Sequence, residues 1–83
     1  MTSDRYACAC CSHLTLFEPP GSFAICPVCY WEDDAQQLHD PSLAGGANRE
    51  SLTEARKNFV AYGASSAQFR DDVRKPNADE MPR

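Results

Sequence analysis

The sequence predicts a small α+β domain that a bound metal ion stabilises, and three observations lead to this fold class. Two CxxC pairs, Cys8–Cys11 and Cys26–Cys29, are separated by fourteen residues, a spacing typical of a tetrahedral site with four thiolate ligands. Apolar residues at helical spacing follow Arg49. The chain has 83 residues, a length at which an apolar core alone is marginal. We therefore expect a hairpin that carries two metal-binding knuckles, followed by one or two helices.

A single domain is expected over residues 1–76. The hairpin is expected over about 6–38, a loop over 39–50, and the helices over about 51–75. Residues 77–83 are polar and contain proline, so a disordered tail is expected there.

The hairpin is predicted from two short apolar segments around a turn. Leu14–Phe17 mixes aliphatic, β-branched and aromatic residues and is expected to form a strand. Pro20 and Gly21 favour a type II turn, because proline restricts φ and glycine tolerates the positive φ that follows. Phe23–Ile25 is expected to be the returning strand, and residues 35–38 are expected to form a third short strand.

The first helix has recognisable ends. Ser51 and Glu54 match a capping box, and Gly63 is expected to end the helix in a left-handed conformation. A second short helix is expected after Ser65 or Ser66, and Pro76 stops it. The apolar face of the first helix is predicted to consist of Leu52, Ala55, Phe59 and Tyr62.

The predicted metal ligands are the cysteines at the ends of the two CxxC pairs. Choosing Cys10 instead would leave one residue or none between the first two ligands, which is too short for the usual knuckle. We therefore expect Cys10 to be a bystander, and His13 to be a neighbour of the site and not a ligand. The ligand set is Cys8, Cys11, Cys26 and Cys29.

Zinc is the predicted ion, because a closed four-sulfur site in a small intracellular protein is usually structural zinc. Such a site resembles the knuckle hairpins of zinc ribbons and rubredoxins, and the spacing does not separate zinc from iron. The chain begins without an apolar signal segment and has no run long enough to span a membrane. Five cysteines in such a chain favour metal binding in a reducing cytoplasm over a disulfide framework.

The net charge of −4 is distributed unevenly along the chain. Residues 1–40 carry one basic and six acidic residues, and residues 41–83 carry seven basic and six acidic residues. There is no lysine or arginine between Cys8 and Cys29, so we do not expect nucleic acid as a partner.

An aromatic and acidic run follows the last predicted ligand and permits two interpretations. Trp31 is expected to shield the metal cluster from water, because tryptophan is usually highly buried. The acids Glu32, Asp33 and Asp34 would either bond to nearby backbone N–H groups or, together with Trp31, form a partner-binding surface.

Several sequence blocks together resemble one family. They are Cys8 to Cys11, Cys26 to Cys29 with Trp31 to Asp34 behind it, Gly45 to Asn48, Ser51-Leu52, Glu54 to Arg56, Asn58-Phe59 and Gly63. In this combination the chain resembles the bacterial cysteine-rich CPCC family from about Tyr6 to Pro76. Ala9 replaces the proline for which the family is named, which removes a φ restraint but no ligand. The resemblance implies a small zinc-ribbon-like protein and, through similar proteins that accompany bacterial toxin systems, weakly implies a toxin-related role.

The expected function is that of a non-catalytic protein-binding module. Four thiolates would close the metal to substrates, and a magnesium site built from the acids near His39 is less expected than a solvated acidic loop. The acidic half favours a basic partner, for example a bacterial toxin that an immunity or antitoxin protein neutralises. The alternatives are a nucleic-acid-associated zinc ribbon and a rubredoxin-like iron electron carrier.

Overall fold

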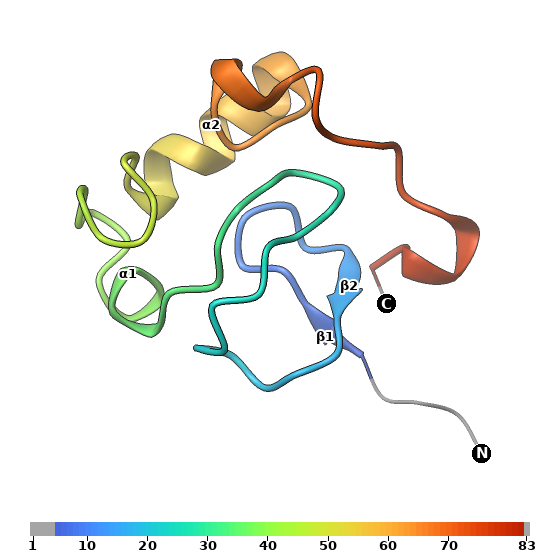
Figure 1. The fold of residues 1–83 in the computed structure, drawn as a ribbon, viewed down its shortest axis with the longest axis horizontal. Helices are drawn as coiled ribbons and strands as arrows, with labels where there is room; N and C mark the ends of the chain where they lie inside the picture. Colours follow the sequence, from blue (N-terminus) through green and yellow to red (C-terminus); the bar gives the residue numbers. More distant parts are fainter. Residues whose placement is uncertain (1–4, 83) are drawn as a thin grey trace.

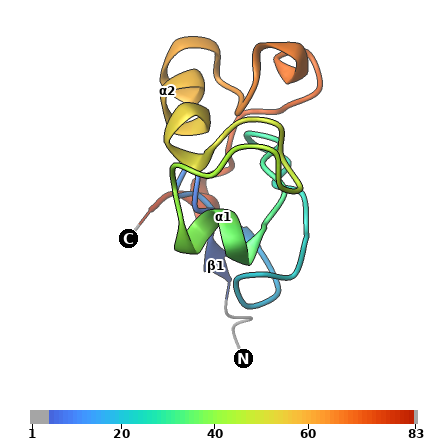
Figure 2. The ribbon, with the colours of Figure 1, turned by 90° about the vertical axis from the view of Figure 1, so that its left-hand side faces the viewer.

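The computed structural model describes residues 5–82 and has the predicted fold class. A β-hairpin and two cysteine knuckles form one part, and α2 with the 3₁₀ helix η1 lies above both the hairpin and α1 (Figures 1 and 2). The elements are β1 (Tyr6–Ala7), β2 (Leu14–Leu16), α1 (Ala35–His39), α2 (Leu52–Tyr62), η1 (Ala67–Phe69) and the 3₁₀ helix η2 (Ala78–Glu80). Within the described residues, no helix combines the length and the apolar character that crossing a membrane requires.

The observed hairpin pairs the predicted strand at 14–17 with a different segment from the one expected. The predicted strand over Leu14–Phe17 is present as β2, but it pairs antiparallel with β1 across the first knuckle. The predicted returning strand Phe23–Ile25 was wrong, since that segment does not pair with β2 and instead forms an isolated bridge between Ile25 and Glu32 and backbone hydrogen bonds with Asp33. The physical reason is local: Phe23 has a φ of +63°, and a left-handed residue interrupts an extended strand.

Residues 35–38 belong to α1, so the predicted third strand was also wrong. Asp34 caps this helix: its side chain accepts hydrogen bonds from the N–H groups of Gln36 and Gln37 at 2.8 and 3.4 Å. Gln37 is fully buried, and its side-chain amide donates to the carbonyl oxygens of Leu43 and Glu50, both at 2.9 Å. The helix therefore anchors the loop that follows it.

A second amide side chain ties this loop to the segment behind the metal ligands. The Asn48 side chain donates to the carbonyl of Glu32 at 2.7 Å and accepts from the Glu32 N–H at 2.9 Å. The residues expected to form a simple loop at 39–50 are thus held at several points by partly buried hydrogen bonds.

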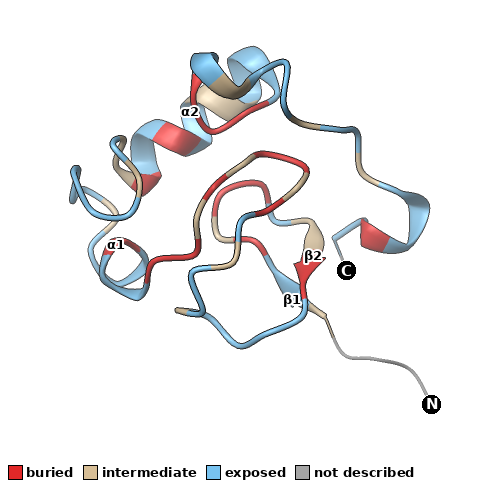
Figure 3. Cartoon of the chain, viewed as in Figure 1, coloured by how far each residue is buried: buried red, intermediate tan, exposed pale blue. Residues whose placement is uncertain are grey.

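Helix α2 begins and ends where predicted, although within the described residues only the Ser51 half of the predicted capping box forms. The Ser51 hydroxyl accepts from the N–H of Glu54 at 3.1 Å, and Gly63 ends the helix with a φ of +77°. Leu52 and Ala55 are completely buried against the knuckles, as the predicted apolar face requires. The face does not extend to Tyr62, which is 50% exposed, and Figure 3 shows that the buried residues of α2 lie in the first half of the helix.

The predicted helix after Ser66 is only the single 3₁₀ turn of η1. No side-chain cap supports it, since the Ser66 hydroxyl does not bond to the turn that follows. The short η1 is followed by an extended segment that returns toward the hairpin (Figure 1).

The tail over 77–83 was predicted to be disordered, and the structure corrects this for the residues that it describes. Helix η2 contacts β2, and Glu80 is buried. The Glu80 carboxylate accepts two hydrogen bonds from the Arg74 guanidinium, both at 2.8 Å, and Arg5 pairs with Asp79 at 2.6 Å. The polar and charged residues on which the prediction of disorder rested include the groups that attach the tail to the domain. Residues 1–4 of the predicted domain and Arg83 of the predicted tail lie outside the described residues.

The core consists largely of sulfur-bearing side chains. All five cysteines belong to it, and α2 contributes two residues. The full set is Cys8, Cys10, Cys11, Leu16, Cys26, Val28, Cys29, Trp31, Leu52 and Ala55. With so few large apolar side chains, much of the stabilisation must come from whatever holds the cysteines together.

Candidate metal centre

The structure brings together the four cysteines that the CxxC spacing singled out. The sulfur atoms of Cys8, Cys11, Cys26 and Cys29 all lie within 4.8 Å of one another. The Cys8 and Cys29 sulfurs are 3.5 Å apart, and those of Cys11 and Cys26 are 3.7 Å apart. Sulfurs bound at about 2.3 Å to a tetrahedral ion would be separated by about 3.8 Å, so this arrangement fits a four-thiolate metal site.

The same four side chains are sealed from water. Cys26 and Cys29 have no exposed surface, and Cys8 and Cys11 are 1% and 8% exposed. Burial excludes competing water ligands, and four soft sulfur donors suit zinc or iron and not magnesium or calcium. Among the described residues this is the only His, Cys, Asp and Glu group with metal-binding geometry, so the acids near His39 do not form a second one.

Cys10 is buried but stands outside the ligand group, in agreement with the predicted register. Its thiol lies beside Cys29 and is the largest cause of the raised pKa of the Cys29 thiol. A fifth sulfur therefore packs against the site without completing it.

The electrostatics of the cluster show what a cation would change. Hydrogen bonds from Cys11 first, and then from Cys29 and Cys8, lower the pKa of Cys26. The pKa of Cys8 is raised, chiefly by Cys11, and that of Cys11 is raised, chiefly by Cys26. Without an ion the cluster therefore favours a single thiolate, at Cys26, which accepts hydrogen bonds from the neighbouring thiols. A divalent ion replaces those protons and allows all four sulfurs to be thiolates.

The two knuckles are built alike. In the first, the carbonyl oxygen of Cys8 accepts from the N–H of Ser12 at 2.8 Å. In the second, the carbonyl oxygen of Cys26 accepts from the N–H of Tyr30 at 2.7 Å. Ser12 and Tyr30 directly follow the second cysteine of each pair, and both are left-handed, with φ values of +70° and +69°. Sequence reasoning missed these positions, because the left-handed requirement is usually visible as a glycine and neither residue is one.

Three further residues support the site and were not found from the sequence. The Thr15 hydroxyl lies 3.0 Å from the Cys26 sulfur, close enough to donate a hydrogen bond to a thiolate. The N–H of Ser65 donates to the Cys29 carbonyl at 2.7 Å, and the N–H of Arg74 donates to the Pro27 carbonyl at 3.1 Å. The backbone bonds join the second knuckle to segments far along the chain, and no local pattern in the sequence signals them.

The predicted partner-binding run requires a correction. Trp31 is 1% exposed and packs in the core with the cysteines, as expected for a residue that shields the site. Asp33 and Asp34 are 2% and 6% exposed, and only Glu32 is half-buried. The surface proposed for a partner is therefore mostly interior.

The two buried acids bond to backbone N–H groups. The Asp33 carboxylate accepts from the N–H of Gly21 at 2.9 Å. The second carboxylate oxygen of Asp34 accepts from the N–H of Ala47 at 2.8 Å, and this bond is the main reason that the pKa of Asp34 is lowered. Of the two interpretations of the acidic run, the structure supports the one in which Asp33 and Asp34 accept hydrogen bonds from backbone N–H groups.

His13 does not join the ligand group. Its ring contacts Phe59 in an edge-to-face arrangement with centroids 6.0 Å apart. The Nδ1 atom is buried and has no hydrogen-bond partner within the described residues. The side chain thus joins the first knuckle to α2 by packing.

Comparison with known proteins agrees with the geometry. No curated protein of significant similarity is found. The sequence model of the cysteine-rich CPCC family matches residues 6–80, which is most of the chain and includes both knuckles, α2 and η2. With four buried cysteines in metal-binding geometry and this match, the chain belongs to the cysteine-rich CPCC family.

Proposed function

We propose that the chain is a non-catalytic module that binds another protein, and that zinc holds its fold. The observation that carries the proposal is the closed geometry of the four buried sulfurs. A zinc ion with four thiolate ligands keeps no position for a substrate or water, so it stabilises structure and does not act as a Lewis acid.

The surface of the domain supports a binding role. Several large apolar side chains face solvent: Phe17, Phe23, Ile25, Val60 and Tyr62 are 66%, 57%, 49%, 88% and 50% exposed. Exposed apolar residues are common singly, but aromatic residues supply much of the binding free energy in protein interfaces. A small metal-rigidified domain presents such side chains at little entropic cost.

The narrower proposal, an immunity or antitoxin role against a basic bacterial toxin, has lost part of its support. It depended on an exposed acidic surface formed by Glu32, Asp33 and Asp34. Two of these carboxylates are buried and bonded to backbone N–H groups, so they are not available to a cationic partner. The protein-binding proposal therefore does not depend on the charge of this run.

Metal analysis tests the zinc part of the proposal and the electron-carrier alternative together. Protein produced without added metal should contain one zinc ion per chain and be colourless. The sulfur separations fit iron equally well, so visible absorption and a reversible reduction potential would favour a rubredoxin-like carrier instead.

Co-purification tests the binding part. The zinc-loaded chain should retain a protein from the native host, and the two purified proteins should form a complex of defined stoichiometry. The matched control is the double variant Cys26→Ser/Cys29→Ser, which should lose both zinc and the partner. Recovery of RNA or DNA alone would contradict the proposal and support the nucleic-acid alternative.

A further inference from the structure

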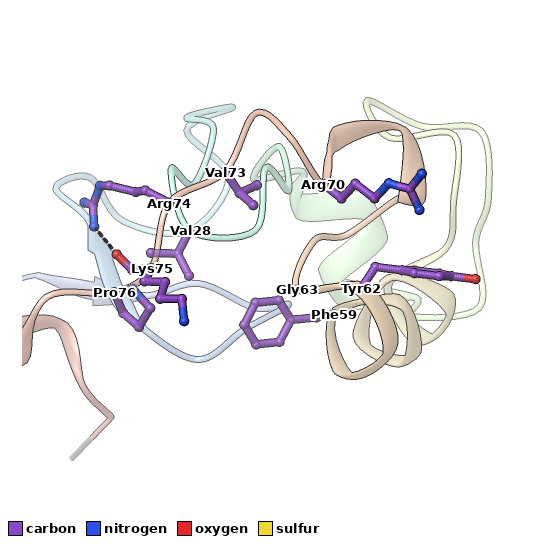
Figure 4. Close-up of a pocket in the computed structure, with 9 residues that line it drawn as sticks. All are labelled: Val28, Phe59, Tyr62, Gly63, Arg70, Val73, Arg74, Lys75 and Pro76. Atoms are coloured by element: carbon purple, nitrogen blue, oxygen red, sulfur yellow. Dashed lines mark hydrogen bonds between the residues drawn. The ribbon is translucent and has the colours of Figure 1, made fainter.

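A pocket of about 320 Å³ lies beside the second knuckle, and Val28 of that knuckle is one of its lining residues. Figure 4 shows its two walls: the C-terminal end of α2 lies on one side, and the extended segment that leads to Pro76 lies on the other. Val28, between the two ligands of the second knuckle, also lines the pocket and lies beside Arg74 and Lys75 in Figure 4. The lining residues are Val28, Phe59, Tyr62, Gly63, Arg70, Val73, Arg74, Lys75 and Pro76.

The lining combines an apolar interior with basic residues only. Arg70, Arg74 and Lys75 all belong to one wall, and no acidic residue lines the pocket. Asp71 and Asp72 lie on the same segment but are exposed outside the pocket. The positive charge is therefore local, in a chain whose net charge is −4.

Two of the three cations remain available to a ligand. The Arg74 guanidinium is occupied by both carboxylate oxygens of Glu80 at 2.8 Å. Over residues 5–82, no salt bridge includes Arg70 or Lys75. An anionic group at this wall would therefore find unpaired cations and would not have to displace a carboxylate.

We propose that this pocket binds a peptide segment of the partner protein in which an aromatic or aliphatic side chain lies next to a carboxylate. The inference rests on the proposed function and names the chemistry of the partner. The volume is at the lower end of the range of about 300–1,000 Å³ for ligand sites, which suits one side chain and not a whole cofactor. The apolar side chain would contact Val28, Phe59 and Val73. The carboxylate would face Lys75, whose side chain extends toward Phe59 in Figure 4, with Arg70 at the far end of the pocket over Tyr62.

The pocket is coupled to the metal site through its backbone. The N–H of Arg74 donates to the carbonyl of Pro27, inside the second knuckle, at 3.1 Å. Gly63 on the other wall is followed closely by Ser65, whose N–H donates to the Cys29 carbonyl at 2.7 Å. Both walls are attached to the loop that the ion holds, so the metal-loaded chain is the form to test.

The experiment titrates the zinc-loaded, ¹⁵N-labelled chain with N-acetyl-L-phenylalanine and follows amide chemical shifts. We expect shifts at Val28, Gly63 and Val73, with a dissociation constant of about 1 mM for so small a ligand. N-acetyl-L-phenylalaninamide lacks the carboxylate, and N-acetyl-L-aspartate lacks the apolar ring. Each should bind at least about fivefold more weakly, because each loses one of the two contacts.

Matched variants then test the cations. Arg70→Gln/Lys75→Gln should weaken binding of N-acetyl-L-phenylalanine about tenfold, whereas Arg49→Gln/Lys57→Gln removes the same charge from exposed positions elsewhere and should leave it unchanged. Zinc content and the amide spectrum establish that both variants are folded. Equal shifts with all three probes, shifts at other residues, or equal weakening in both variants would overturn the inference.

The same variants separate this inference from the proposed function. If Arg70→Gln/Lys75→Gln still binds the purified partner with unchanged affinity, the pocket is not the docking site, although the chain still binds a protein. If N-acetyl-L-phenylalanine binds as expected but no protein complex forms, the pocket assignment holds for its chemistry and the proposed function fails.

Discussion

Replacing Asp34 with alanine removes a carboxylate that holds two separate parts of the chain. One oxygen caps α1 through the N–H groups of Gln36 and Gln37, and the other accepts from Ala47 in the loop before α2. Loss of the cap costs about 1 kcal/mol. Loss of a hydrogen bond to a charged group costs about 1.5 kcal/mol here, the low end of its range, because Ala47 is exposed and water can replace the carboxylate. The free energy of unfolding of Asp34→Ala should therefore fall by about 2.5 kcal/mol.

Thermal unfolding at a fixed, saturating zinc concentration measures this change. For a domain of this size the expected loss lowers the melting temperature by about 10–20 °C. Glu32→Ala is the matched control, since Glu32 carries the same charge in the same run and its side chain makes no hydrogen bond within the part of the chain that the structure describes. It should change the free energy of unfolding by less than about 0.5 kcal/mol.

The pH dependence gives a second check on the same carboxylate. Because the pKa of Asp34 is lower in the folded chain than in the unfolded one, its contribution is present above the unfolded value of 3.8 and is lost as the pH falls through the folded value. The difference between Asp34→Ala and the wild type should therefore be the same at pH 6 and at pH 7.5. Equal melting temperatures for Asp34→Ala and Glu32→Ala would refute the structural role of this acid.

Four other predictions follow from the structure. Cys26→Ser should abolish zinc binding and folding, whereas Cys10→Ser should retain one zinc ion per chain by elemental analysis, because the Cys10 sulfur lies outside the ligand group. Gly46→Ala should lower the melting temperature, because the added Cβ would lie 2.7 Å from the Asp34 carboxylate and overpacking of this kind costs about 1–3 kcal/mol. Ser12→Gly should raise the melting temperature, since glycine removes a left-handed strain of about 1–2 kcal/mol and costs about 0.5–1 kcal/mol in backbone entropy; a decrease would contradict the strain argument. Glu80→Gln should cost about 1–2 kcal/mol and expose the tail to faster amide exchange at pH 7. The reason is that Arg74 lowers the pKa of Glu80 from 4.5 to about 2, so its stabilisation is complete above pH 4.5 and is lost only as the pH falls toward 2.

The sequence by itself determined the features that depend on near neighbours. A CxxC pair positions two sulfurs within one turn of backbone, so the ligand group around Cys8 and Cys26 was predictable from spacing. Ser51 and Gly63 act on N–H and C=O groups within a few residues, so the ends of α2 were predictable as well. The cap formed by Asp34 is equally local, because Asp34 directly precedes Ala35-Gln36-Gln37 and an aspartate is a common N-cap. The helix was nevertheless missed, because these residues were expected to form a strand.

Only the tertiary structure decided which polar side chains are interior. Asp33 bonds to Gly21, Asp34 bonds to Ala47, and Glu80 bonds to Arg74, and in each case the partner lies beyond the reach of local pattern rules. A carboxylate is stable in the interior when donors converge on it, and such convergence depends on how distant segments pack. For this reason an acidic run that resembled a binding surface proved to be internal support, and a polar tail that resembled a disordered end proved to be attached to the domain.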